Sequence, residues 1–184
     1  MKLKAFLMVI AFVGSMAFAD AQIAVKDSKF LNLGLGIGTN LYSGVHYSGQ
    51  VPPISASFEY VIKDELFDEN SSLGVGGYLG YTAYKWTSGD YGWKYSSIVI
   101  GPRGYLHYSF VDKLDTYTGL TLGYNILTSK WTGSAAEWGS ASSGGLAYAW
   151  FVGGRYFFSD NIAAMAELGY GITYLTIGVC IGLN

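Results

Sequence analysis

The sequence is poor in charge, proline and cysteine. Charged residues make up 13% of its 184 residues, about half the roughly 25% found in an ordinary soluble domain. The single cysteine excludes a disulfide framework and a zinc site built from cysteines. A formal net charge of -2 excludes the basic surface that usually binds nucleic acid, so we expect no nucleic-acid partner.

Long apolar runs are also missing, except at the N-terminus. Two lysines precede an apolar run at residues 5–13, and small residues follow it. This order is typical of a secretory signal peptide, and the run is shorter than the roughly 20 residues of a membrane-spanning helix. We predict a signal peptide over residues 1–21, cleaved after Ala19 or Ala21, and a single mature domain over residues 22–184.

Hydrophobic residues (51%), aromatic residues (17%) and glycine (26 residues) are abundant instead. Apolar side chains recur at every second position, which is the period of a β-strand whose two faces differ. In the first run, leucine, isoleucine and Thr39 occupy one face, and glycine and asparagine occupy the other. Such runs predict about eight strands, at residues 31–41, 54–62, 73–83, 98–110, 117–126, 146–158, 162–170 and 173–183.

Charge decides which face points outward. The four charges near strand centres, Glu59, Arg103, Arg155 and Glu167, all fall on the small, polar face. A soluble lipocalin-like barrel would place its apolar face inside and its charges outside. A face of mostly glycine, serine and alanine suits the narrow interior of a barrel whose apolar face meets lipid. Because open sheet edges would leave unpaired backbone groups in hydrocarbon, we predict an all-β fold, a closed antiparallel up-and-down transmembrane β-barrel.

Aromatic residues of the apolar face gather near the ends of the runs. With the N-terminus on the periplasmic side, they form girdles at the two membrane interfaces. Longer outer loops are expected at residues 42–51, 86–94 and 127–144, and charged or tight inner turns are expected at residues 63–71, 111–115 and 159–161. The predicted girdle residues are Tyr60, Tyr108, Phe110, Tyr156 and Phe158 at the inner rim, and Tyr81, Tyr124, Tyr148, Trp150 and Tyr170 at the outer rim.

Four segments carry a resemblance to known proteins: residues 100–105, 112–120, 153–157 and 166–171. With these segments the chain resembles the small eight-stranded outer-membrane barrels of the OmpA-transmembrane-domain and OmpX-like group. It is also similar to the "porin family" outer-membrane barrels of Bacteroidetes. The resemblance covers essentially the whole mature chain. It implies location in the bacterial outer membrane, with membrane lipid and the barrel-assembly machinery as partners.

Three functions remain open. The interior charges form either a gate for small solutes or a set of ions that neutralise one another. We favour mutual neutralisation, because ions removed from water need partners of opposite charge. A lipid-modifying enzyme would need a nucleophile beside a histidine at the outer rim. His46, between Ser43 and Ser48, is the only candidate there, because His107 is predicted to point inward. We therefore expect no enzyme, no catalytic residue, no cofactor and no metal.

The third function is recognition of an unknown surface ligand. Aromatic side chains among glycine and serine are typical of adaptable binding surfaces, although loops of this composition can also simply pack on themselves. A structural or surface-interaction role through the outer loops is the favoured prediction. The predicted contact residues are Tyr42, His46, Tyr47, Trp86, Tyr91, Trp93, Trp131 and Trp138.

Overall fold

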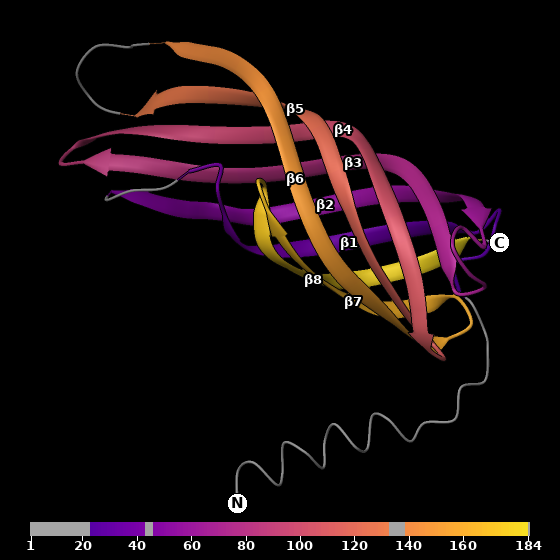
Figure 1. The fold of residues 1–184 in the computed structure, drawn as a ribbon. Helices are drawn as coiled ribbons and strands as arrows, with labels where there is room; N and C mark the ends of the chain where they lie inside the picture. Colours follow the sequence, from indigo (N-terminus) through magenta and orange to yellow (C-terminus); the bar gives the residue numbers. More distant parts are fainter. Residues whose placement is uncertain (1–22, 43–45, 133–138, 184) are drawn as a thin grey trace, which may run out of the picture.

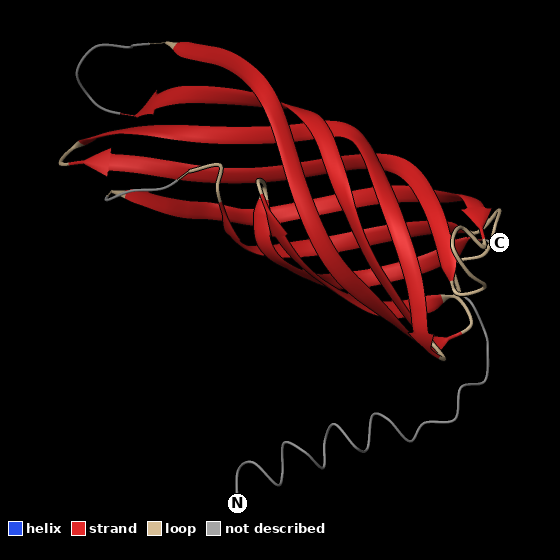
Figure 2. Ribbon diagram, viewed as in Figure 1, coloured by secondary structure: helices blue, strands red, loops and turns tan. Residues whose placement is uncertain are grey.

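The computed structural model describes residues 23–42, 46–132 and 139–183, so the predicted signal peptide lies outside the described residues. Eight strands close into a barrel in which each strand pairs with the next and β8 pairs with β1 (Figure 1, Figure 2). Every pairing is antiparallel. The predicted closed barrel is therefore confirmed. The strands are β1 (Lys29–Thr39), β2 (Tyr47–Asp64), β3 (Ser71–Ser88), β4 (Tyr91–Val111), β5 (Leu114–Thr132), β6 (Ser140–Ser159), β7 (Ile162–Tyr170) and β8 (Thr173–Leu183).

The apolar face of the strands points outward. Leu35, Ile100 and Leu122 are 45%, 54% and 55% exposed, whereas the side chains of Glu59 and Arg155 are completely buried inside. This is the inverse of a soluble barrel, and it suits an exterior surrounded by lipid. The lipocalin-like alternative is therefore wrong, because an apolar belt lies on the outside and ions lie within.

No helix in the described residues is long and apolar enough to cross a membrane.

The two ends of the barrel differ. The start of β1, the end of β8 and the β2–β3, β4–β5 and β6–β7 turns lie at one end, which we call the terminal end (Figure 1). At the other end, β3, β4, β5 and β6 continue well beyond β1, β7 and β8 (Figure 1). Residues Ser140 to Ala149 of β6 pair with β5 and have no partner in β7. We call residues 82–88, 91–97, 125–132 and 140–147 the projecting sheet.

The predicted outer loops are therefore mostly strands. Only Gly89 and Asp90 connect β3 to β4, and a positive φ of 58° at Gly89 allows this tight turn. Cross-strand aromatic pairs stabilise the ladder where glycine and serine suggested a loop, as in Trp86 opposite Trp93 and Trp93 opposite Trp131. The placement in loops was wrong for Tyr47, Trp86, Tyr91, Trp93 and Trp131, which are strand residues.

One strand face also departs from the prediction. Thr39 and Leu41 were expected on the outward face with Leu31 to Ile37, but Thr39 is buried and its hydroxyl donates to the carbonyl of Ile172. Leu41 packs against a cluster of buried residues in the barrel. The cause is Gly38, whose φ of 73° breaks the alternation of the strand.

Candidate functional site

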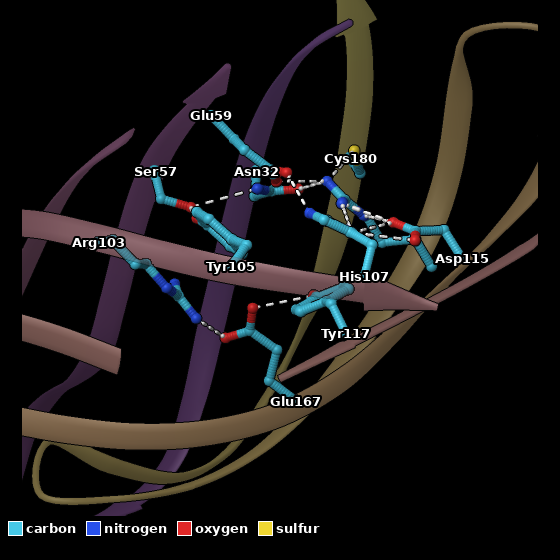
Figure 3. Close-up of polar contacts among 11 residues, drawn as sticks. Asn32, Ser57, Glu59, Arg103, Tyr105, His107, Asp115, Tyr117, Glu167 and Cys180 are labelled. Atoms are coloured by element: carbon cyan, nitrogen blue, oxygen red, sulfur yellow. Dashed lines mark hydrogen bonds and ion pairs between the residues drawn. The ribbon is translucent and has the colours of Figure 1, made fainter. Parts of the chain in front are cut away.

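Six charged side chains from five strands meet inside the barrel (Figure 3). The alternation of each strand turns them inward, and all are at least 94% buried. The four predicted interior charges are among them, and the structure adds two further groups from β4 and β5. The six are Glu59 of β2, Arg103 and His107 of β4, Asp115 of β5, Arg155 of β6 and Glu167 of β7.

Arg155 holds two carboxylates together. Its Nε donates to Asp115 Oδ2 at 2.9 Å, and its Nη2 lies 2.6 Å from the same oxygen. Its Nη1 donates to Glu59 Oε2 at 3.0 Å. The guanidinium also lies over the ring of Phe30, 4.3 Å from its centroid. All its charge-bearing partners are buried, so these contacts replace the water that the ions lose on folding.

His107 lies between the same two carboxylates. Its Nε2 is 2.5 Å from Glu59 Oε1, and its Nδ1 is 3.0 Å from Asp115 Oδ1. Ionised carboxylates only accept hydrogen bonds, so Nδ1 donates to Asp115, Nε2 is in ion-pair contact with Glu59, and the ring between the two carboxylates is an imidazolium. Arg155 Nη2, 3.3 Å from Nδ1, shares the Asp115 carboxylate with it.

A second ion pair joins β4 to β7. Arg103 Nη2 donates to Glu167 Oε2 at 2.8 Å, and the Tyr117 hydroxyl donates to Glu167 Oε1 at 2.9 Å. The Arg103 guanidinium lies 3.6 Å from the Phe151 ring centroid and 5.1 Å from that of Tyr105. The two clusters together contain three cations and three carboxylates, so the interior carries no net charge.

A cavity of about 30 Å³ adjoins this pair, with Tyr78, Phe151 and Ile172 in its lining. It has room for roughly one or two water molecules. Arg103 Nε has no hydrogen-bond partner among the described residues, so a water in this cavity would satisfy it. Rings and paired ions fill the interior around it.

Asp115 and the bridging role of His107 were missed from the sequence. Asp115 was placed in an inner turn, although the turn contains only Asp112 and Lys113. Extending the alternation of β5 backward by one step from Tyr117, which is also buried, would have found it. His107 was expected to point inward, but its contacts with Asp115 on the adjacent β5 and with Glu59 on β2 were not predicted.

The inner face of the projecting sheet is the second candidate site. This face continues the inward side of the strands, and its rings contact one another across the strands. Tyr84 stacks on Tyr42 and on Tyr95, with centroids 4.2 and 5.0 Å apart. Trp131 stacks on Tyr91 at 5.9 Å and meets Trp93 edge-on at 5.2 Å. Four of the expected contact residues, Tyr42, Tyr91, Trp93 and Trp131, thus belong to one cluster of packed rings, which also contains Tyr84 and Tyr95.

The remaining predicted contact residues surround this surface or lie outside the described chain. Tyr47 packs on Tyr84 with centroids 5.9 Å apart, and Trp86 lies opposite Trp93. His46, with a φ of 79°, is in the β1–β2 connection. Trp138 and Ser43 lie outside the described residues, and Ser48 is a residue of β2.

The predicted girdle residues all lie on the outer face of the barrel. At the terminal end, the hydroxyls of Tyr60 and Tyr108 donate to Asp27 and Asp68. Their rings thus face outward while their polar tips reach the turns, as expected at a membrane interface. The other eight are between 36% and 63% exposed: Phe110, Tyr156, Phe158, Tyr81, Tyr124, Tyr148, Trp150 and Tyr170.

The part of the chain that the structure describes contains no candidate metal site. No group of three or more histidine, cysteine, aspartate or glutamate side chains there could hold an ion. Cys180 is buried, and its Sγ lies 3.7 Å from Arg155 Nη1. The interior carboxylates are occupied by the three cations described above.

No protein-family model and no curated protein matches this sequence. Among solved structures, the chain is similar to the N-terminal β-barrel domain of OprF from Pseudomonas aeruginosa, with 14% identity, TM-score 0.49, and coverage of 86% of this chain and 98% of that chain. OprG from the same organism gives 9% identity, TM-score 0.48, and coverage of 89% and 100%. Ail of Yersinia pestis gives 15% identity, TM-score 0.44, and coverage of 86% and 96%. The eight antiparallel strands of this chain close in sequence order into a small up-and-down barrel whose apolar face points outward.

Proposed function

We propose that the protein is an integral barrel of the bacterial outer membrane. Residues 1–21 are the export signal, residues 22–184 form the mature barrel, and the barrel-assembly machinery inserts it into lipid. The apolar belt on the barrel supports this proposal, because a soluble protein rarely exposes so large an apolar surface. Barrels of this type have short periplasmic turns and longer outer connections. The terminal end therefore faces the periplasm, and the projecting sheet faces outward.

The function that this geometry supports best is non-enzymatic contact with an extracellular partner. The observation that carries it is the ordered aromatic inner face of the projecting sheet. A barrel that only spans the membrane needs no strands beyond it. Tyrosine and tryptophan rings that are already packed together offer contact area at a low cost in conformational entropy.

Permeation is the weaker candidate. Eight strands enclose a lumen that side chains just fill, and here those side chains are ion-paired. Opening a path past Arg103 would separate it from Glu167, which is held at 2.8 Å in a buried site. Breaking a buried ion pair costs several kcal/mol or so, so a transient opening would be rare. We therefore assign the interior charges a structural role.

Binding by bacteria that display the protein tests the proposed function. Cells carrying the wild type, a Trp93→Ala/Trp131→Ala variant or a Phe67→Ala variant are compared on host cells and on surfaces coated with matrix proteins or glycans. Phe67 is the matched control, because it is 75% exposed but lies in the β2–β3 turn at the terminal end.

We expect the wild type and Phe67→Ala to bind equally and the double tryptophan variant to lose most of the binding. Surface expression and a heat-dependent shift in electrophoretic mobility establish that each variant is folded. Binding that survives the loss of both tryptophans, or that is lost equally in the control, contradicts the role of the aromatic face.

A further inference from the structure

Three lysines form a single row across the outer face of the projecting sheet. The strand registers place Lys85 of β3 directly opposite Lys94 of β4, and Lys94 directly opposite Lys130 of β5. Directly opposed residues in antiparallel strands have Cα atoms about 5 Å apart. Like charges in such pairs destabilise a sheet. A row of three cations therefore calls for a negative partner.

The described part of the chain does not supply that partner. None of the ion pairs there involves these lysines. Lys94 and Lys130 are exposed and Lys85 is half-buried. The described acidic residue nearest in sequence is Asp90, in the tight β3–β4 turn beyond the row. Most other exposed acidic residues, such as Glu69 and Asp112, lie in turns at the terminal end.

The row lies on the same face as the apolar belt. From the lysines toward the barrel, the next outward-facing row consists of Ala83, Ser96 and Thr128. The row after it is apolar and consists of Tyr81, Ile98 and Ile126. The lysines are thus four residues beyond the last apolar row, about 13 Å along the strands, or about 10 Å along the membrane normal at the usual strand tilt. Lysine stems can bend back toward the interface, which brings the ammonium groups to the headgroup layer.

We propose that Lys85, Lys94 and Lys130 form a docking surface for anionic, phosphate-bearing lipid headgroups of the outer leaflet. Charge complementarity and continuity with the lipid-facing belt identify this occupant. The surface is on the opposite side of the sheet from the aromatic inner face. It fixes the height and tilt of the projecting sheet above the membrane, and it does not depend on the proposed partner contact.

Lipid selectivity in a bilayer tests this proposal. The full mature chain is reconstituted in phosphatidylcholine vesicles, and electron paramagnetic resonance measures the association of spin-labelled phosphatidylglycerol relative to spin-labelled phosphatidylcholine. Each lysine near an anionic headgroup should favour the anionic lipid by roughly fivefold. We expect a preference of at least severalfold in the wild type, falling nearly to parity in Lys85→Gln/Lys94→Gln/Lys130→Gln.

The matched control removes three exposed lysines from the terminal end, in Lys26→Gln/Lys29→Gln/Lys63→Gln, and should keep most of the preference. Equal losses in the two triple variants, or no preference in the wild type, overturn the proposal. If roughly 10 mM inorganic phosphate at constant ionic strength abolishes the preference, the row binds free phosphate and the headgroup assignment is wrong. If the first triple variant fails to fold, Lys94→Gln alone, at the centre of the row, must reduce the preference severalfold.

Discussion

Arg155 is the side chain whose removal should disturb the interior most. In Arg155→Met the apolar stem is kept, but three charged contacts of 2.6 to 3.0 Å are lost, two to Asp115 and one to Glu59. Two buried carboxylates then share the single charge of His107. Removing one partner of a buried ion pair costs about 3–5 kcal/mol. We expect the free energy of unfolding to fall by about that amount.

A second substitution separates charge imbalance from lost packing. Arg155→Met/Asp115→Asn leaves Glu59 and His107 as a neutral pair, and the new amide oxygen can still accept from His107 Nδ1. The double variant should therefore regain about 2 kcal/mol relative to Arg155→Met, although it carries one more substitution. If the substitutions acted only through lost packing, the double variant would be less stable than Arg155→Met.

Urea unfolding in phospholipid vesicles measures these free energies. Tryptophan fluorescence and the heat-dependent shift in electrophoretic mobility follow the same transition. An Arg155→Met barrel that unfolds within about 1 kcal/mol of the wild type would refute the view that Arg155 neutralises the interior. A double variant less stable than Arg155→Met would refute the claim that unbalanced charge in the interior causes the loss of stability.

Two further predictions concern packing and permeation. Gly76→Ala should lower the free energy of unfolding by at least about 1 kcal/mol, because its Cβ would lie 1.8 Å from the Phe58 carbonyl oxygen. Gly77→Ala has open space around its Cβ and should be nearly neutral or stabilising. Equal urea midpoints for the two variants would contradict the close approach of β2 and β3 at this point. Purified protein in planar bilayers should show no regular conductance steps, because Arg103, Glu167 and the rings around them fill the lumen. Reproducible steps of uniform size would show that the interior opens.

The alternation of the strands made the barrel predictable from the sequence. A period of two ran through most of each strand, and the position of Glu59 and Arg155 on the glycine-rich face decided which face points inward. The pairing of those charges could not be predicted in the same way. Partners such as Arg155 and Glu59 are 96 residues apart in the chain, and their contact depends on the tilt and closure of the barrel.

The length of the strands was the main error. Around Trp93 and Trp131 the sequence is rich in glycine, serine and tyrosine, which is typical of loops. In the barrel, neighbouring strands supply hydrogen bonds and cross-strand ring contacts that favour extended backbone despite that composition. Gly38 caused the smaller error at Thr39, because one residue with positive φ is enough to reverse the faces of a strand.

Labelling of intact cells with a membrane-impermeant maleimide tests the central claim most directly. Ser88→Cys places a thiol on the projecting sheet and Asp112→Cys places one in the β4–β5 turn, and both positions are exposed. Cys180 is completely buried and should stay unlabelled in the folded protein. A barrel that spans the membrane with the projecting sheet outside predicts labelling of Ser88→Cys in intact cells, and of Asp112→Cys only after the outer membrane is opened. Equal labelling of the two variants in intact cells, or labelling of Asp112→Cys alone, would contradict it.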